Sequence, residues 1–214
     1  MSQLGPEKAL IFRITHINNV GWILNNGLHC KNAGLLDPNY VEIGNSDLIG
    51  RRGHRIVPVP PGGTLSDYIP FYFTPYSPML LNIKTGYNGI TRRPMSEIAI
   101  LVSSLRTLQE QAIPFVFTDR HAYLQTAEDS FSGDLEHLDR IDWKILRARD
   151  FKRNPDDPGK FERYQAEALV HNHLPVAALL GVICHGAAQE LQLRQLAEDA
   201  GVALDVMAKP GWYV

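Results

Sequence analysis

The polar side chains that could carry chemistry are spread along the whole chain. His16 follows an apolar stretch near the start, and Arg51 lies in a long polar connection. His121 follows a short apolar segment, and Glu167 lies among apolar residues near the end. Such dispersion is normal for a site that loops build on a sheet. The sequence therefore raises one question, whether Glu167 is held for chemistry or belongs to a surface ion pair.

Each of these side chains also has a purely structural interpretation. His16 could cap a helix, and Arg51 could pair with Asp47 four residues before it. Glu167 lies four residues after Arg163, and an exposed pair at this spacing contributes only about 0.3–0.5 kcal/mol. Local patterns alone therefore do not assign Glu167 a role in catalysis.

Familiar catalytic motifs are missing from the sequence, including the P-loop, G-x-G-x-x-G, H-E-x-x-H, G-x-S-x-G and C-x-x-C patterns. His171 and His173 would share a face on a strand and diverge on a helix, but no third clustered ligand completes a zinc site. Cys184 and His185 are adjacent, although partnered groups of a site are rarely sequence neighbours, which favours a buried thiol. We therefore expect neither a metal enzyme nor a thiol enzyme.

Length and composition bound the class of protein. The chain has 214 residues, of which 44% are hydrophobic, and this suits one domain (1–214) with a core of its own. Its two cysteines lie far apart, and "MSQLGPEKAL" has no signal-peptide core, so we expect a cytoplasmic protein. No apolar run approaches the roughly 20 residues of a membrane helix.

The net charge of −2 argues against a protein that coats nucleic acid regardless of its sequence. Positive charge is nevertheless clustered along the chain. Each cluster is either a solvated face paired with nearby carboxylates or part of a local groove for a polyanion. The clusters are Arg51, Arg52 and Arg55; Arg92 and Arg93; and Arg147, Arg149, Lys152 and Arg153.

Hydrophobic patterning predicts strands and helices without a regular βαβ rhythm, which favours an α+β domain with an antiparallel or mixed sheet. We expect strands in residues 9–17, 69–83 (broken by Pro75 and Pro78), 98–104, 114–122, 177–186 and 202–214. We expect helices in residues 17–27, 105–111, 187–201 and partly in 124–147, with a short one around 46–51. Residues 161–174 have helical propensity, but the residue types leave helix or strand open at Glu167.

Several segments, taken together and in order, resemble the DarT family of DNA ADP-ribosyltransferase toxins. "DYIPFYFTPYSPM" and "RYQAEALV" are the more specific pieces, and the matching segments cover most of the chain. They are "ITHINNVGWILNNGL" (14–28), "IGRRGHRIVPVPPGGTLSDYIPFYFTPYSPML" (49–80), "FTDRHA" (117–122), "LDRIDW" (138–143) and "RYQAEALVHNHLP" (163–175).

The resemblance implies an ADP-ribosyltransferase fold with central antiparallel or mixed sheets and flanking helices. It implies NAD⁺ as a substrate, transfer of ADP-ribose to a base in single-stranded DNA, typically thymidine in a short context, and no metal. A DarG-like macrodomain antitoxin would reverse the modification. The alternatives are transfer to RNA or protein, plain NAD⁺ hydrolysis, and a catalytically inactive module that only binds DNA.

The resemblance also implies roles for residues on the NAD⁺ side. His16, Ile17 and Asn18 match the first NAD⁺-contacting strand end, and Asn25 matches a further nucleotide contact. Residues 38–56 would form the NAD⁺-binding element. The family's catalytic arginine aligns with Arg51, although Arg52 and Arg55 are close enough for a shift, and its catalytic glutamate aligns with Glu167.

On the DNA side, residues 121–167 would form the region that recognises the target. His121 would contact phosphate or base there, although it could also be an ordinary loop histidine. The cluster of Arg147, Arg149, Lys152 and Arg153 would follow the DNA backbone. Tyr72, Phe73 and Tyr76 would stack on nicotinamide or on a base, although Phe71 and Phe73 equally suit a core.

The chemistry of such a transfer needs a carboxylate and an arginine. Nicotinamide leaves C1′ of a ribose through a positive, oxocarbenium-like transition state, which the carboxylate of Glu167 would stabilise while it holds the 2′-OH. The acceptor base must lose a proton, and Glu167 is the sole carboxylate in the matched set. Arg51 suits a diphosphate or developing negative charge, but a guanidinium group stays protonated in proteins and is therefore a poor base.

Overall fold

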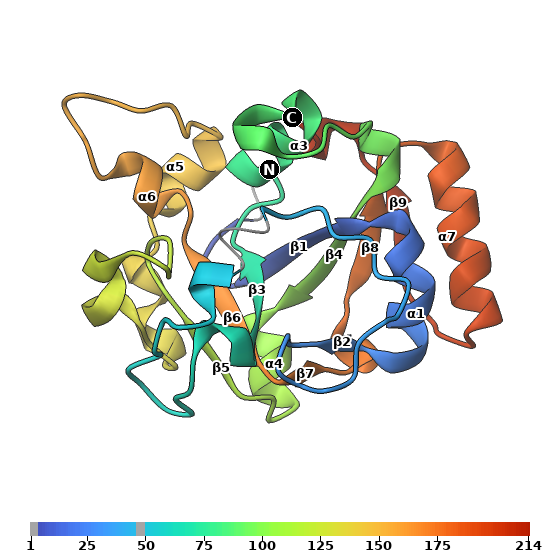
Figure 1. Ribbon diagram of the computed structural model, residues 1–214, viewed down its shortest axis with the longest axis horizontal. Helices are drawn as coiled ribbons and strands as arrows, with labels where there is room; N and C mark the ends of the chain where they lie inside the picture. The colour runs from blue at the N-terminus through green and yellow to red at the C-terminus, as the bar shows by residue number, and fades with distance from the viewer. Residues whose placement is uncertain (1–3, 46–49) are drawn as a thin grey trace.

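A mixed sheet of seven strands lies at the centre of the computed structural model, which describes residues 4–45 and 50–214 (Figure 1). The strand order is β5-β6-β3-β1-β4-β8-β9, and β8–β9 is the one parallel pair among the neighbours described. The expectation of an α+β domain with a mixed sheet is therefore confirmed. The strands are β1 (Leu10–His16), β3 (Tyr68–Tyr72), β4 (Ile98–Ser104), β5 (Phe115–Phe117), β6 (Glu167–His171), β8 (Gly181–Cys184) and β9 (Val206–Ala208).

Strands β1 and β4 form a long, fully paired ladder in the middle of this sheet. Its register runs from Leu10 opposite Ser104 to His16 opposite Ile98, so every residue of both strands is paired. All seven residues of β4 are buried, because side chains cover both faces of the sheet there. An apolar run without alternation is the pattern expected of such a strand. The strand end at His16 was predicted and is confirmed.

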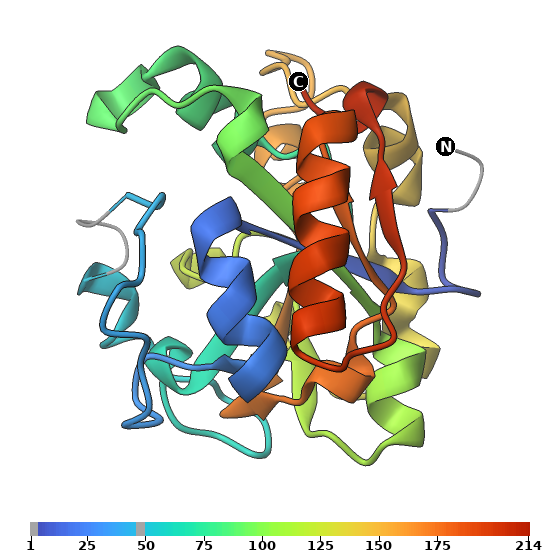
Figure 2. The same cartoon turned by 90° about the vertical axis from the view of Figure 1, so that its right-hand side faces the viewer.

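Helices cover the sheet on more than one side. Figure 2 shows α7 crossing one face with α1 beside it, and a Cβ added at Gly21 of α1 would lie 3.6 Å from Leu196 of α7. The α-helices are α1 (Val20–Asn26), α3 (Pro78–Thr85), α4 (Leu105–Glu110), α5 (Trp143–Ala148), α6 (Lys160–Arg163) and α7 (Ala187–Asp199). Short 3₁₀ turns lie at Ile17–Asn19, Leu65–Asp67, Tyr87–Gly89, Met95–Glu97, Gln125–Ser130, Leu135–Arg140, Val176–Ala178 and Pro210–Trp212.

The apolar segment 69–83 differs from its prediction as one broken strand. Strand β3 ends at Tyr72, and α3 begins at Pro78. Ser77 caps this helix, because its hydroxyl accepts a hydrogen bond from the backbone N–H of Leu80. Proline at the first helical position has a suitable φ and needs no N–H donor. Pro78 therefore starts a helix here and does not interrupt a strand.

The segment 161–174 also differs from its helical propensity. Helix α6 ends at Arg163, and Glu167 is the first residue of β6. Strand β6 is paired on both sides, with Glu167 opposite Tyr72 of β3 and Ala168 opposite Phe117 of β5. Two sets of ladder hydrogen bonds outweigh a weak local preference for helix. After β6, β7 (His173–Leu174) pairs with β2 (Leu28–His29) in a second, two-stranded sheet.

A long excursion joins β5 to β6, and in Figure 1 it forms the yellow and orange part of the molecule, beside the sheet. It contains α5, α6 and two of the 3₁₀ turns, as the mixed polar and helical pattern predicted. The short helix predicted around 46–51 lies partly outside the described residues, but residues 50–52 are helical. This turn, cyan in Figure 1, lies in front of β3 and β6.

Candidate active site

Glu167 lies at the point where the excursion returns to the sheet. Its side chain is 3% exposed. The backbone N–H of Thr118 donates to the carbonyl of Glu167 at 2.8 Å, and the N–H of Glu167 lies 3.4 Å from the Thr118 hydroxyl. Tyr72 faces Glu167 across the β3–β6 ladder. The backbone of Glu167 is therefore held in the sheet, even though loops surround its carboxylate.

Arg52 and His121 hold this carboxylate from two sides. Arg52 donates from Nη1 to Oε1 at 3.0 Å and from Nη2 to Oε2 at 2.7 Å, which is a bidentate fork. The backbone N–H of Ala122 donates to Oε1 at 3.1 Å, and Nδ1 of His121 lies 3.0 Å from the same oxygen. Both oxygens of Glu167 therefore accept hydrogen bonds from charged or polar donors.

The tautomer of His121 follows from its two contacts. Its Nδ1 lies 3.0 Å from the Glu167 carboxylate and 3.3 Å from the backbone N–H of Tyr123. One nitrogen cannot donate to the first and accept from the second at once. The shorter contact and the full negative charge favour Nδ1–H donating to Glu167. In the neutral ring Nε2 then carries the lone pair.

Opposing effects act on the pKa of Glu167. Burial raises it, but the charges and hydrogen bonds of Arg52 and His121 lower it more, so the pKa lies well below its usual range. Burial lowers the pKa of Arg52, and the adjacent carboxylate raises it above its usual value. Both members of the pair are therefore charged at neutral pH. Burial and the charge of Glu167 raise the pKa of Tyr72 to about 12, so its phenol stays protonated.

The arginine that binds the Glu167 carboxylate is Arg52. It is not the neighbouring Arg51, which the family resemblance favoured. Arg51 is exposed, and among the described residues its side chain has no hydrogen bond or ion pair. The shift by one position, left open by the sequence, occurs because successive residues of a helical turn point in different directions.

A cavity of about 580 Å³ opens beside this cluster, within the usual size range of small-molecule pockets. Glu167, Arg52 and His121 line it together with Tyr72 of β3. Other lining residues come from β1, α1, β2 and α3, namely Arg13, Ile14, Trp22, Ile23, Leu28, His29 and Met79. Arg13 was not among the predicted site residues, although it lies in the same strand as His16.

The segment 31–45 supplies another wall of the cavity and is anchored at both ends. Near its start, the amide of Asn32 donates to Asp67 at 2.7 Å. Near its end, Asn19 holds the backbone of Val41 twice, accepting from N–H at 2.8 Å and donating to C=O at 3.0 Å. Between the anchors lie exposed apolar side chains that line the cavity: Leu35, Leu36 and Tyr40.

The predicted NAD⁺-binding element 38–56 overlaps the cavity wall only in part. Residues 46–49 lie outside the described chain. Of the others in this range, Tyr40, Glu42, Ile43, Gly44, Asn45 and Arg52 line the cavity.

Four residues predicted to contact NAD⁺ lie elsewhere in the described structure. His16 caps the turn that follows it, accepting from the N–H of Asn18 at 3.2 Å, and its Nε2 lies 3.4 Å from Glu97. Ile17 is buried in the core, Asn18 is exposed, and Asn25 donates to a carbonyl of its own helix at 2.8 Å. None of the four lines the described part of the cavity. The cap proposed as the structural alternative for His16 is confirmed.

Of the predicted aromatic and DNA contacts, Tyr72 and His121 line the cavity at Glu167, and the others do not. Tyr76 packs near Phe151 and under the guanidinium of Arg149, 4.8 Å from its ring centre, and does not line the described cavity. Phe71 and Phe73 are buried in the core. Among the basic side chains, Arg147 donates to the Leu4 carbonyl, Arg149 to the Gly211 carbonyl, Arg153 covers Phe161, and Lys152 is exposed.

Arg163 does not pair with Glu167. Its guanidinium forks onto Asp157 at 3.0 and 2.7 Å and also reaches Asp142 at 3.3 Å. The contact between Arg163 and Asp142 joins the two ends of the segment 142–163. Because Glu167 is in a strand, the helical i,i+4 geometry that would bring it to Arg163 does not arise.

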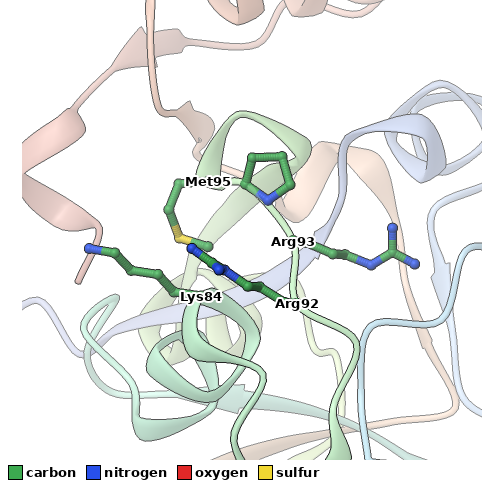
Figure 3. A pocket seen from close by; sticks show the side chains of 5 residues that line it. Lys84, Arg92, Arg93 and Met95 are labelled. Carbon is green, nitrogen blue, oxygen red and sulfur yellow. The ribbon is translucent and has the colours of Figure 1, made fainter.

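The cluster of Arg92 and Arg93 belongs to a separate hollow of about 390 Å³, which Figure 3 shows with Lys84 and Met95. Arg93 turns away from Lys84 in this view and pairs with Glu97 at 3.2 Å. Lys84 donates to the carbonyl of Val214. This hollow shares no lining residue with the cavity at Glu167.

Among residues 4–45 and 50–214, no three histidine, cysteine, aspartate or glutamate side chains converge as a metal site. His173 stacks on His29, with ring centres 4.4 Å apart, and Cys184 is buried. In the same residues, no helix has the length and apolar character needed to cross a bilayer.

Comparisons with known proteins point to one family. A family model described as "ssDNA thymidine ADP-ribosyltransferase, DarT" matches residues 12–214. A DNA ADP-ribosyl transferase of Escherichia coli O127:H6 is 53% identical over 212 residues, covering 99% of this chain and 96% of that one. One from Thermus sp. strain 2.9 is 40% identical over 182 residues, covering 84% and 82%.

Solved structures agree with this match. Thermus sp. 2.9 DarT in complex with ADP-ribosylated ssDNA is similar with a TM-score of 0.89 and 32% identity, over 100% of both chains. The same protein in complex with NAD⁺ gives a TM-score of 0.83 over 98% of this chain and 100% of that one. Thermosipho africanus DarTG in complex with ADP-ribose shares the fold, with a TM-score of 0.72 at 16% identity, and this chain covers 50% of it.

Proposed function

This chain belongs to the DarT family of ssDNA thymidine ADP-ribosyltransferases, and we propose how its own residues carry out that reaction. The enzyme transfers ADP-ribose from NAD⁺ to single-stranded DNA. The bond between C1′ and nicotinamide breaks, nicotinamide leaves with the electron pair, and a thymine nitrogen bonds to C1′. The proton of that nitrogen passes to an acceptor, so charge and atoms balance.

The observation that carries the proposal is the buried carboxylate of Glu167 beside a cavity of about 580 Å³. NAD⁺ binds there with its nicotinamide ribose next to Glu167. The departing nicotinamide leaves positive charge on the ribose, and a fixed carboxylate in a water-poor site stabilises this charge more than water would. One oxygen of Glu167 accepts a hydrogen bond from the ribose 2′-OH, and this hydrogen bond strengthens in the transition state.

Arg52 has the role of positioning Glu167. Both of its terminal nitrogens are engaged by the carboxylate, at 3.0 and 2.7 Å, so the fork fixes the plane of that group. Arg52 also keeps Glu167 ionised, because it lowers the pKa of this carboxyl. We assign the catalytic arginine function to Arg52 in place of Arg51.

The proton of thymine goes to His121 in this proposal. A carboxyl whose pKa lies far below its usual range is a weak proton acceptor, so Glu167 is poorly suited while Arg52 is bound to it. His121 donates through Nδ1 to Glu167 and lines the cavity, which leaves Nε2 as its basic nitrogen. A carboxylate that orients a histidine in this way is a recurrent arrangement in acid–base catalysis.

The segment 121–167 recognises the DNA in this proposal, because it starts and ends at the reacting carboxylate. Lys152 and Arg153 are exposed on it and are suited to backbone phosphates. A macrodomain antitoxin that removes the modification is the expected partner. We place the reaction in the cytoplasm, where NAD⁺ and single-stranded DNA are both present.

Mass spectrometry of short oligonucleotides of varied sequence, incubated with the protein and NAD⁺, tests the function. We expect a mass increase of one ADP-ribose on thymidine-containing strands, dependent on NAD⁺, with parallel RNA and protein pools unmodified. Label on RNA or protein but not on DNA would refute the DNA target. Nicotinamide release that does not depend on added DNA would identify a plain NAD⁺ hydrolase. Glu167→Gln is the inactive control, and Arg51→Ala is the active one.

A further inference from the structure

Two segments contact the carboxylate of Glu167, and Arg55 joins them. The first segment is the turn 50–57, which carries Arg52. The second is the segment 121–131, in which His121 and Ala122 contact the carboxylate. These two segments are far apart in sequence, so the spacing of Arg52 and His121 depends on contacts between them.

Arg55 makes the polar contact between the two segments. Its Nη2 donates to the carbonyl of Leu124 at 3.1 Å and lies 3.4 Å from that of Gln125. Its own backbone N–H bonds to the carbonyl of Arg52 at 3.0 Å, and its carbonyl accepts from Leu65 at 2.9 Å. Arg55 is thus tied by backbone to the catalytic turn and by side chain to the recognition segment.

Apolar packing beneath Arg55 does not by itself fix this spacing. A buried apolar cluster joins residues of both segments to the sheet, and it consists of Val57, Leu65, Tyr68, Val116, Ala122, Ala127, Phe131 and Leu169. Apolar contacts are non-directional, whereas a hydrogen bond to a carbonyl specifies distance and direction. The directional link across the junction therefore comes from Arg55.

Arg55 is not held in place by an ion pair with a described carboxylate, whereas Arg52 is. Among the described residues, no carboxylate lies within ion-pair distance of Arg55, and its buried Nε has no hydrogen-bond partner. The side-chain hydrogen bonds that Arg55 makes to described residues are those to the carbonyls of Leu124 and Gln125, so its polar contacts are directed at the segment 121–131.

We propose that Arg55 is a positioning residue for ADP-ribose transfer, which sets the relative placement of Arg52 and His121 across Glu167. This inference rests on the proposed roles of those three residues. Arg55 does not line the described cavity, so it acts on the rate of transfer and leaves the binding of NAD⁺ unchanged. A displacement of a reacting group by about 1 Å is enough to lower a rate by about 100-fold.

The test compares Arg55→Met and Arg55→Lys with the wild type. Methionine keeps an apolar stem but removes the donors, whereas a lysine ammonium can still donate to the Leu124 carbonyl. Arg51→Ala is the matched control, because Arg51 is exposed on the same turn. We measure kcat and KM for NAD⁺ with saturating DNA, and count intact sites by the stoichiometry of binding to carba-NAD⁺.

We expect Arg55→Met to lower kcat per intact site by about 10- to 100-fold, with KM for NAD⁺ within about twofold of the wild type. Arg55→Lys should recover most of the loss. In a His121→Ala background, Arg55→Met should lower kcat by less than about threefold, because coupled residues are not additive.

Three outcomes would overturn the assignment. They are an unchanged kcat per intact site, a loss explained wholly by fewer intact sites, and a full effect that persists in the His121→Ala background. Transfer by the wild type is measured in the same assay, so failure of the proposed function would appear as absence of labelled DNA in every sample, including the wild type.

Discussion

Two arginine–carboxylate pairs in this molecule have the same geometry and different surroundings. Arg52 grips Glu167 with its two terminal nitrogens at 3.0 and 2.7 Å, and Arg163 grips Asp157 at 3.0 and 2.7 Å. The side chains of the first pair are 13% and 3% exposed, and those of the second are 30% and 40% exposed. Distance alone does not distinguish the two pairs.

Their surroundings give the two pairs different consequences. Water and salt screen the charges of Arg163 and Asp157, so this pair joins a loop to itself and contributes little free energy. The side chains of Arg52 and Glu167 are largely buried, so removing either partner leaves a buried charge without its main counter-charge. The same bidentate geometry therefore has two uses. At the surface, Arg163 and Asp157 form a loop contact, and at the cavity, Arg52 and Glu167 provide a preorganised negative charge.

The strongest way to break this comparison is to neutralise each carboxylate in turn. Glu167→Gln keeps the shape of the side chain but removes the charge that stabilises the ribose cation, and we expect kcat to fall by about 1,000-fold. Asp157→Asn removes the matching charge from the exposed fork and should leave kcat within about threefold. Modified oligonucleotide, measured by mass spectrometry, gives both rates. Similar losses in the two variants would mean that burial does not separate the two pairs.

Removing the arginines compares the same pairs through stability. Arg52→Ala leaves Glu167 buried without its main partner, and we expect the free energy of unfolding to fall by about 3–5 kcal/mol. Arg163→Ala should move the denaturant midpoint far less, because water replaces its contacts. Urea unfolding followed by circular dichroism measures both. The comparison would fail if Arg163→Ala were the more destabilised variant.

Acid pH is expected to give the smallest effect. The pKa of Glu167 is lowered in the folded protein, so its stabilising contribution is complete above its unfolded pKa of about 4.3 and decreases as pH falls toward the folded pKa. Below pH about 4.3, the wild type should lose roughly 1.4 kcal/mol per pH unit relative to Glu167→Gln. Urea titrations between pH 7 and pH 3 measure this difference. A difference that stays constant over this range would show that the pKa of Glu167 is not lowered.

The sequence predicted the sheet better than it predicted the site. Strand β4 begins with five consecutive apolar residues, 98–102, and burial on both faces of a sheet favours such a run, so composition reveals it. The family resemblance selected Glu167, which does lie in the cavity. The local pattern around it favoured helix because Ala, Glu and Leu are good helix formers, whereas pairing with β3 and β5 is a long-range contact that no local window contains.

The differences between expectation and structure at single positions have a similar physical cause. Arg51 and Arg52 are identical in type, and only the direction of a short helical turn decides which one reaches Glu167. His16 was expected at NAD⁺ because the family resemblance matched it to an NAD⁺-contacting strand end, but a strand end is also where a helix cap is needed. Arg13 lines the cavity from within β1, where its charge in an apolar strand is the signal that could have indicated it.

The return of the excursion to its starting point has an evolutionary consequence. Thr118 and Glu167 are hydrogen-bonded neighbours, so the excursion leaves the sheet and rejoins it at one place, and on the way Ser132 pairs with Phe117 of β5. Insertions, deletions or exchange of residues within 133–160, beyond the segment 121–131 that contacts Glu167 and Arg55, need not shift the carboxylate, because the ladder holds its backbone from both sides. Lineages can therefore diversify the target sequence while they inherit an unaltered reaction centre, and an engineer could exchange residues 133–160 without replacing His121.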